Sequence, residues 1–445
     1  MSKIHAIRPR LVASAFAALM LLTPAGARAE GWYVKSYAEI AAPAAAQNGP
    51  SETAELKAIV AKRSADDIAR FRWWSVGGPA YRWNEIILDE MLQGFVTLPM
   101  AARHLALFHT ALDDAMAASR QHRQPGSRPR AATVDAALKA SASGAPVPSE
   151  HAAAAAAAAE VLGYLFPARA AFLAARAEEA MRTRLLAGVE FPSEIAAGKA
   201  VGAKVAALAI ARGKADGSDA KWTGTVPDAP GQWKSANPPI APAAGGWKTW
   251  VLDRPGEVRP AAPPAIDSDR VKADLAELKA FSRTPLSNNR ATYWEVFGGA
   301  RAHMLWNEIA RTKLLEYGTA PAAAARVLAA LNVALADAGI ACWEAKYVYW
   351  YPRPAQLDPE LKTVFPAPNH PAYPSAHSCF STAAAAVLAK AFPQDAARLW
   401  GIGNEASEAR IWAGIHYRFD TEAGQEIGRK VAEKTLARAF TGKTN

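Results

Sequence analysis

The chain has 445 residues, and its 51 lysines and arginines outnumber its 41 aspartates and glutamates, so the net charge is +10. Two cysteines in a chain of this length exclude a disulfide-based scaffold. The basic residues form no Lys/Arg block. The excess of positive charge therefore does not indicate nucleic-acid binding and agrees with a small anionic substrate.

The first 29 residues have the pattern of a secretory signal peptide. Lys3, Arg8 and Arg10 precede an apolar run of 12 residues from Leu11 to Leu22, and the small-x-small sequence Ala27-Arg28-Ala29 follows. A membrane span needs about 20 apolar residues, so we expect cleavage near Ala29. Cleavage removes four basic residues and no acidic one, which lowers the net charge to +6. The pattern predicts a secreted or periplasmic protein that is not integral to a membrane.

The rest of the chain predicts an all-α fold. Apolar residues recur at helical spacing in 83–98, 102–118 and 161–186, and few stretches resemble strands. Glycine and proline fall mostly at the expected helix boundaries.

An internal repeat indicates two copies of one helical unit. The sequence Trp83-Asn84-Glu85-Ile86 returns as Trp306-Asn307-Glu308-Ile309. Further along the chain, proline, glycine and arginine residues match between the two copies at a constant offset. Each copy would bury its apolar helix faces against the other. We therefore predict two tandem, pseudo-symmetric bundles packed as one body. The predicted boundaries are 30–212 for the N-terminal bundle, 213–272 for a connector and 273–445 for the C-terminal bundle, with the repeat itself at 51–212 and 273–438.

The connector is rich in proline, glycine and tryptophan. Long connections without regular structure are uncommon unless they are functional or disordered, and the tryptophans argue against disorder. We expect an ordered belt whose aromatic side chains fill grooves on the helical body, as packing rather than as a ligand cage. The tryptophans concerned are Trp222, Trp233, Trp247 and Trp250.

The densest set of chemically informative residues lies in three motifs of the C-terminal copy. They are Lys346-x6-Arg353-Pro354, Pro374-Ser375-Ala376-His377 and Arg410-x5-His416-x3-Asp420. Arginine binds oxyanion oxygens as a fork, lysine adds a point charge, and a helix start adds a hydroxyl and backbone amides. Histidine can act as nucleophile, ligand or acid/base. Together the motifs predict a site for phosphate or an anion of that shape.

Each motif also has a plain structural interpretation. Lys346 alone would be a solvated helix residue, Ser375 a simple N-cap, and His416 with Asp420 an ordinary hydrogen-bonded pair. In the site, Asp420 would instead orient His416 and raise its basicity. A metal site made of His370, His377, His416 and Asp420 is a further alternative, which the neighbouring cations disfavour.

The N-terminal copy lacks essential parts of this set. Pro148-Ser149-Glu150-His151 stands opposite the second motif and Arg184 opposite Arg410, but Glu190 takes the place of His416 and Glu194 that of Asp420. No lysine stands seven residues before an Arg-Pro near Arg128-Pro129. A carboxylate in the axial position repels an oxyanion, so we interpret this copy as degenerate.

The three motifs resemble the signature of the vanadium haloperoxidase and type 2 phosphatidic acid phosphatase superfamily. That signature is Lys-x6-Arg-Pro, Pro-Ser-Gly-His and Ser-Arg-x5-His-x3-Asp, and this chain departs from it at Ala376 and Ala409. Alanine keeps the backbone amide but adds a methyl group to a tight pocket. The resemblance is densest over 330–438, and the paired bundles of the secreted haloperoxidases extend it to most of the mature chain.

The resemblance implies a role for each motif residue. The oxyanion would be held by Lys346, Arg353, Ser375, the Ala376 amide and Arg410. His416 would be the axial vanadate ligand, or in a phosphatase the nucleophile that becomes phosphohistidine, and His377 the acid/base. Trp343 and His370 lie where family members tune halide selectivity, and histidine at position 370 favours bromide or iodide over chloride.

The leading hypothesis is thus an exported vanadate-dependent haloperoxidase that uses hydrogen peroxide and a halide, with Lys346 polarising the peroxide. The alternative is a periplasmic acid phosphatase acting on phosphate monoesters, which requires no cofactor. A catalytically inactive secreted binding protein is the third hypothesis. Cys342 and Cys379 each lie within four residues of a site residue, and we expect buried free thiols rather than a disulfide.

Overall fold

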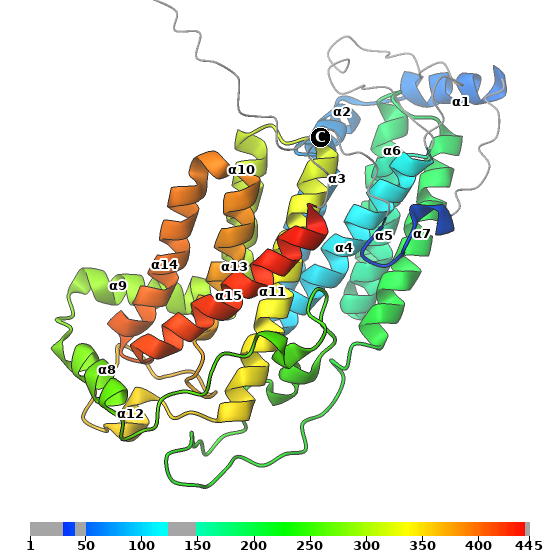
Figure 1. Ribbon diagram of the computed structural model, residues 1–445. Helices are drawn as coiled ribbons and strands as arrows, with labels where there is room; N and C mark the ends of the chain where they lie inside the picture. The colour runs from blue at the N-terminus through cyan, green and yellow to red at the C-terminus, as the bar shows by residue number, and fades with distance from the viewer. Residues whose placement is uncertain (1–29, 41–49, 123–147, 441–445) are drawn as a thin grey trace, which may run out of the picture.

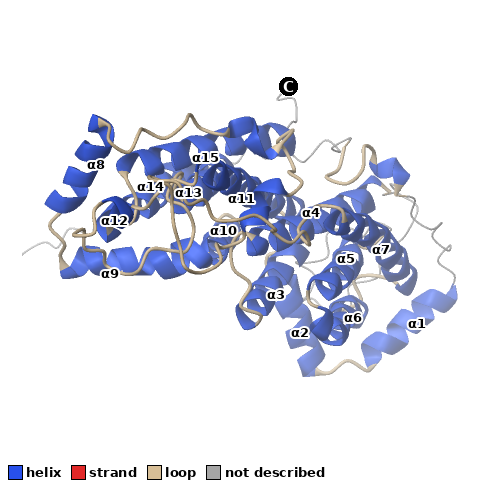
Figure 2. Ribbon diagram, turned by 90° about the horizontal axis from the view of Figure 1, so that it is seen from below, coloured by secondary structure: helices blue, strands red, loops and turns tan. Residues whose placement is uncertain are grey.

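The computed structural model describes residues 30–40, 50–122 and 148–440, and its regular structure is helical throughout (Figures 1 and 2). No strand occurs within these ranges, so the predicted all-α fold class is confirmed. The expected signal peptide and Arg128-Pro129 lie outside the described residues.

The N-terminal half is built around α5, against which α4, α6 and α7 pack. Its helices are α1 (Pro50–Ala61), α2 (Ala65–Ser75), α3 (Pro79–Gln93), α4 (Met100–Gln121), α5 (Glu150–Leu165), α6 (Ala170–Leu186) and α7 (Pro192–Lys214). The alanine run Ala152–Ala158 is buried, and its small side chains let the neighbouring helices approach closely.

The C-terminal half is built around α13, which packs against α11, α14 and α15. Its helices are α8 (Asp269–Ala280), α9 (Pro285–Tyr293), the π-helical segment η6 (Trp294–Ala300), α10 (Ala302–Glu316), α11 (Pro321–Tyr349), α12 (Pro354–Leu357), α13 (Ala376–Ala391), α14 (Ala396–Ala413) and α15 (Arg418–Ala439). Figure 1 shows α11 running between the two groups of helices.

The two halves meet along α4 and α11 and share a buried amide network. Asn84 Nδ2 donates to Asn307 Oδ1 at 2.7 Å and lies 2.8 Å from His109 Nε2, while Asn307 Nδ2 donates to Asn332 Oδ1 at 2.9 Å. The pairs Asn84–His109 and Asn307–Asn332 each span 25 residues, one pair in each half. All four side chains are fully buried, so these hydrogen bonds fix how the halves align.

Paired glycines bring corresponding helices into backbone contact in each half. A side chain on Gly198 of α7 would collide with the Ser149 carbonyl at the start of α5. A side chain on Gly424 of α15 would collide with the Ser375 carbonyl at the start of α13. This correspondence agrees with the predicted repeat; that the halves arose by duplication remains a prediction.

The connector between α7 and α8 is ordered and lies against α11. Its only helical turns are η4 (Pro242–Gly246) and η5 (Pro255–Val258). The backbone amides of 250–252 donate to the Asp337 carboxylate, and Trp233 and Trp247 are buried. These tryptophans therefore serve packing.

Within the described residues, one helical stretch, Pro321–Leu357, is long and apolar enough to cross a membrane. Of its apolar window, 94% is buried inside the protein, as expected for a core helix.

A candidate oxyanion site

The three sequence motifs converge at the end of the C-terminal bundle. Lys346 lies in the last turn of α11, Arg353 caps α12, Ser375 caps α13 and Arg410 lies in the last turn of α14. His416 follows in the α14–α15 turn. All are 2% exposed or less, so the motif residues form the buried floor of one site.

The Lys346 ammonium group is held by backbone oxygens. Nζ donates to the carbonyls of Pro371, Ala372 and Pro374 at 2.7, 2.9 and 2.5 Å. Burial lowers the pKa of Lys346 from 10.5 to about 8, and the positive charge of Arg353 adds to this. The lysine is thus still charged near neutral pH, where the loop 371–374 and an anion can share its charge.

Arg353 links the loop before α13 to the loop after α14. Its Nε donates to the His370 carbonyl and Nη1 to the Ile415 carbonyl, both at 3.1 Å. Nη1 also donates to Nε2 of His416 at 2.8 Å. Burial lowers the pKa of Arg353 to about 10, so the guanidinium stays charged across the physiological range.

His416 has a defined tautomer. Nδ1 donates to Asp420 Oδ2 at 2.8 Å, and the same oxygen accepts from the Tyr417 amide at 3.1 Å. Because Arg353 can only donate, Nε2 of His416 carries the lone pair. Burial, with Arg353 and Lys346, lowers the pKa of His416 well below 6.5, which keeps the ring neutral. A neutral imidazole with an oriented Nε2 is suited to attack or ligate an electrophilic centre.

Ser375 forms the N-cap of α13 and is tied to α15. Its amide donates to the Asp420 carbonyl at 2.9 Å, and its side chain accepts from the Ser378 amide at 3.5 Å. Ala376 is the first residue of α13 and is 7% exposed. The amides of a helix's first turn have no intrahelical partner and face the positive end of the dipole, which favours an anion here.

The other side of the site is held by a segment that the sequence analysis missed. Arg410 Nη1 donates to Glu295 Oε2 at 2.6 Å and Nη2 to the Ala291 carbonyl at 3.0 Å. His377 Nε2 donates to the Trp294 carbonyl at 2.9 Å. The segment α9–η6 thus contacts both residues, yet it carries no motif. The sequence feature closest to this segment is the repeated motif that begins at Trp306, and it does not indicate contact with the site.

Trp343 and His370, the residues expected to tune halide selectivity, lie side by side. The rings of Trp343 and His370 are 5.5 Å apart, and Nη2 of Arg353 lies 3.1 Å from Nδ1 of His370. Trp343 Nε1 donates to the carbonyl of Ile240, a connector residue, at 3.1 Å. The connector therefore reaches the neighbourhood of the site.

Among the described residues, neither the cysteines nor the acidic residues form a metal centre. Cys342 and Cys379 are buried and carry free thiols. In the part of the chain that the structure describes, no three His, Cys, Asp or Glu side chains are grouped so that they could hold a metal cation. This finding leaves the alternative metal site at His370, His377, His416 and Asp420 without support.

The charge balance of the site fits a bound oxyanion. Three buried cations, Lys346, Arg353 and Arg410, face the buried carboxylate of Asp420 and the partly exposed Glu295. Nε of Arg410 is buried and has no hydrogen-bond partner among the described residues. A tetrahedral oxyanion such as vanadate or phosphate supplies the missing charge and acceptors.

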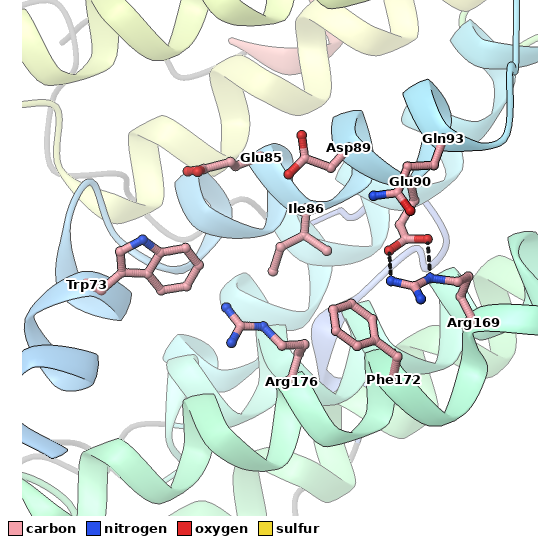
Figure 3. A pocket seen from close by; sticks show the side chains of 9 residues that line it. All are labelled: Trp73, Glu85, Ile86, Asp89, Glu90, Gln93, Arg169, Phe172 and Arg176. Atoms are coloured by element: carbon pink, nitrogen blue, oxygen red, sulfur yellow. Dashed lines mark hydrogen bonds and ion pairs between the residues drawn. The ribbon is translucent and has the colours of Figure 1, made fainter. Parts of the chain in front are cut away.

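The cavity drawn in Figure 3 is separate from this site. It has a volume of about 200 Å³ and lies in the N-terminal half between α2, α3 and α6. Glu90 accepts from Nε and Nη2 of Arg169 at 2.9 and 3.0 Å, and Arg176 donates to Glu179 at 2.9 Å. None of the motif residues lines the cavity, and its arginines already have carboxylate partners.

Comparison with known proteins supports this description of the fold. Residues 326–433, which contain all three motifs, match the PAP2 superfamily. The non-specific acid phosphatase of Salmonella typhi is 39% identical over 56 residues, which are 13% of this chain and 22% of that protein. The chain thus matches about a fifth of the length of this relative.

Two kinds of solved structure share the fold. A bacterial vanadium-dependent iodoperoxidase has a TM-score of 0.64 at 22% identity, covering 80% of this chain and 94% of its own. A bacterial vanadium-dependent chloroperoxidase in its holo form has a TM-score of 0.53 at 15% identity, covering 78% and 93%.

Residues 326–433 match the PAP2 superfamily, and the resemblance predicted from the motifs is confirmed. The two solved structures share the fold of this chain.

Proposed function

We propose that the protein is an exported vanadate-dependent haloperoxidase that oxidises bromide or iodide with hydrogen peroxide. The observation that carries the proposal is the buried cluster of Lys346, Arg353 and Arg410 around the lone pair of His416. Support also comes from the two-bundle architecture, which a protein described as an iodoperoxidase shares over 80% of this chain.

Vanadate, when bound, supplies an electrophilic centre that activates peroxide towards halide. The chain's own residues would hold and neutralise it: His416 Nε2 would be its ligand, while the three cations, Ser375 and the Ala376 amide would bind its oxygens. Asp420 keeps the proton of His416 on Nδ1. His377 would accept the peroxide proton and return it to the departing water, and Lys346 would polarise the peroxide. Overall, hydrogen peroxide, a halide ion and one proton give hypohalous acid and water.

The halide preference rests on Trp343 and His370. The imidazole of His370 lies beside the indole of Trp343, with the ring centroids 5.5 Å apart. The pKa of His370 is lowered well below 6.5 by burial and by Lys346 and Arg353, so the ring is neutral. A neutral ring adds no further attraction for chloride, which is the most strongly hydrated of the three halides, and bromide or iodide is favoured.

A second candidate is a periplasmic acid phosphatase. The specific observation in its favour is the 39% identity to a non-specific acid phosphatase over 56 residues. The same neutral His416 would attack the phosphorus of a monoester and form phosphohistidine. His377 would protonate the leaving alcohol, after which water would release inorganic phosphate. This reaction needs no vanadate.

One paired assay separates the candidates. The mature protein is incubated with vanadate, hydrogen peroxide and bromide or iodide, and separately with a chromogenic phosphate monoester without vanadate. We expect halide oxidation that disappears in His416→Ala. Monoester turnover without halide oxidation favours the phosphatase, and absence of both activities in folded protein favours the inactive binding protein.

A further inference from the structure

The N-terminal half contains a counterpart of the oxyanion site, built on the same backbone frame. The Ser149 amide donates to the Glu194 carbonyl at 3.0 Å, as the Ser375 amide donates to the Asp420 carbonyl at 2.9 Å. Ser149 caps α5 as Ser375 caps α13, with its side chain accepting from the Ala152 amide at 3.0 Å. The helix start that faces the anion is therefore present twice.

The turn that presents the arginine is also repeated. Gly188 and Gly414 both have positive φ, 69° and 76°, which favours glycine at this helix end. The amide one residue after each glycine bonds to the arginine carbonyl at 3.2 Å, at Arg184 in one half and Arg410 in the other. Position 190 thus follows Arg184 as position 416 follows Arg410.

Of the three cations of the C-terminal site, this counterpart retains the one at Arg184. Arg184 is 7% exposed and its guanidinium lies 5.2 Å from the Phe71 ring, as Arg410 lies 5.6 Å from Phe365. Burial lowers the pKa of His151 well below 6.5, and the charge of Arg184 lowers it further, so this ring is neutral. The first helical residue, Glu150, pairs with Arg120 at 2.8 Å and adds little net charge.

The difference between the halves is the group that faces the arginine. Nε of Arg184 donates to Glu190 Oε1 at 3.1 Å, and both side chains are 8% exposed. Oε2 of Glu190 is buried and has no hydrogen-bond partner among the described residues. Nε of Arg410, by contrast, has no partner of its own. In one half the Nε of the arginine is satisfied by a buried carboxylate, whereas in the other half Nε stays open among the described residues while Nη1 pairs with Glu295.

We infer that the N-terminal half holds a second oxyanion site, and that the Glu190 carboxylate is its built-in occupant. Removing the charge of Glu190 leaves Arg184, Ser149 and the start of α5 as donors for a tetrahedral oxyanion such as phosphate. The inference rests on the assignment of 346–420 as an oxyanion site, which is part of the proposed function. It explains how the N-terminal half buries an arginine without a ligand.

The test is the number of inorganic phosphate ions that bind to the mature protein, measured by isothermal titration calorimetry. Wild type and Glu190→Gln are compared, with Glu178→Gln as the matched control because Glu178 is an exposed glutamate that pairs with Lys199 on the surface. We expect Glu190→Gln to bind one phosphate more than wild type, and Glu178→Gln to bind the same number as wild type. The double variant Glu190→Gln/Arg184→Met should lose the additional ion.

A second measurement covers the case in which Glu190→Gln folds poorly, since an unpaired buried arginine is destabilising. Phosphate should then raise the melting temperature of Glu190→Gln by several degrees more than that of wild type, and Arg184→Met should abolish the difference. An unchanged phosphate number together with an equal thermal shift overturns the inference. An additional ion that persists without Arg184 also overturns it.

The outcome is separable from that of the proposed function. If 346–420 binds no oxyanion, wild type binds no phosphate and the proposed function fails. The number of additional phosphate ions bound by Glu190→Gln relative to wild type still tests this inference. If wild type binds one phosphate and Glu190→Gln also binds one, only this inference fails.

Discussion

The two sides of the candidate site are held in different ways. On one side, Lys346 and Arg353 bond to backbone carbonyls of the loops 368–374 and 415, close to the motifs themselves. On the other side, Arg410 and His377 depend on the α9–η6 segment, more than 80 residues earlier. Carbonyl oxygens are present whatever the side chains are, but the carboxylate of Glu295 is a single replaceable group. The first side should therefore be robust to substitution around it, and the second side adjustable.

The largest loss of oxyanion affinity is expected when Arg353, on the first side of the site, is replaced. Arg353→Met removes the donor to His416 Nε2 and the hydrogen bonds to the His370 and Ile415 carbonyls. Truncating a buried, hydrogen-bonded charge costs about 2–5 kcal/mol, so oxyanion affinity should fall at least about 30-fold. Calorimetric titration with phosphate or vanadate measures this. Arg398→Met, at an exposed arginine of α14, serves as the control, and an equal loss there would contradict the assignment.

A pH dependence sharpens the comparison at Lys346. Burial lowers its pKa to about 8, so the ammonium group is charged below that pH and neutral above it. Anion binding requires the charged form. Affinity should therefore fall as pH rises through 8, by about tenfold per unit.

Sulfate is a suitable probe for this experiment because its charge is constant over the range. Lys346→Met should bind sulfate more weakly and should lose the fall in affinity that is centred on pH 8. A wild-type profile that also lacks this fall would show that the lysine does not titrate with the anion.

The second side is tested at Glu295. Glu295→Gln keeps the shape but removes the negative charge beside Arg410, whose Nη2 still bonds to Ala291. Because Glu295 is partly exposed, the effect is moderate: we expect kcat to fall about five- to tenfold, while oxyanion affinity rises. Glu308→Gln, which removes an exposed carboxylate from α10, should change neither quantity. Weaker oxyanion binding with unchanged kcat would contradict this account of the second side.

The smallest effect is expected at Gly299. A Cβ on this residue would lie 3.0 Å from Cε1 and Nε2 of His377, so Gly299→Ala displaces the imidazole slightly. We expect kcat to fall about two- to fivefold, since small displacements of an acid/base reduce proton transfer. Gly401→Ala is the control, because apart from its chain neighbours and the backbone of its own helix no atom lies within 4 Å of the added methyl group. It should leave activity unchanged and raise stability by about 0.5–1 kcal/mol.

The sequence alone predicts one side of the site far better than the other. Each motif residue is recognisable because its residue type and spacing carry the chemistry, and the structure brings Lys346, Arg353 and His416 together as expected. Glu295 and the Trp294 carbonyl are not recognisable, because a lone glutamate and a backbone oxygen have no signature. Only the π-helical geometry of η6, with Gly299 outside helical conformation, brings them to the site.

In the fold, too, some features could be predicted from the sequence and others could not. Helical periodicity predicted the all-α class, since it follows from local apolar spacing. The contact between the halves could not be predicted, because Asn84 and Asn307 meet across 223 residues and an asparagine within a helix has no periodicity of its own. The connector was expected to be ordered from its tryptophans, but its bonds to Asp337 and Trp343 depend on the packed body.

Helix α11 gives the N-terminal half a part in the chemistry. This helix is about 43 Å long and packs along α4. Lys346 lies one turn before its C-terminal end. A shift of α11 along α4 by one residue would move Lys346 by about 1.5 Å. The N-terminal half, by packing along α11, thus fixes the position of Lys346 in the candidate site.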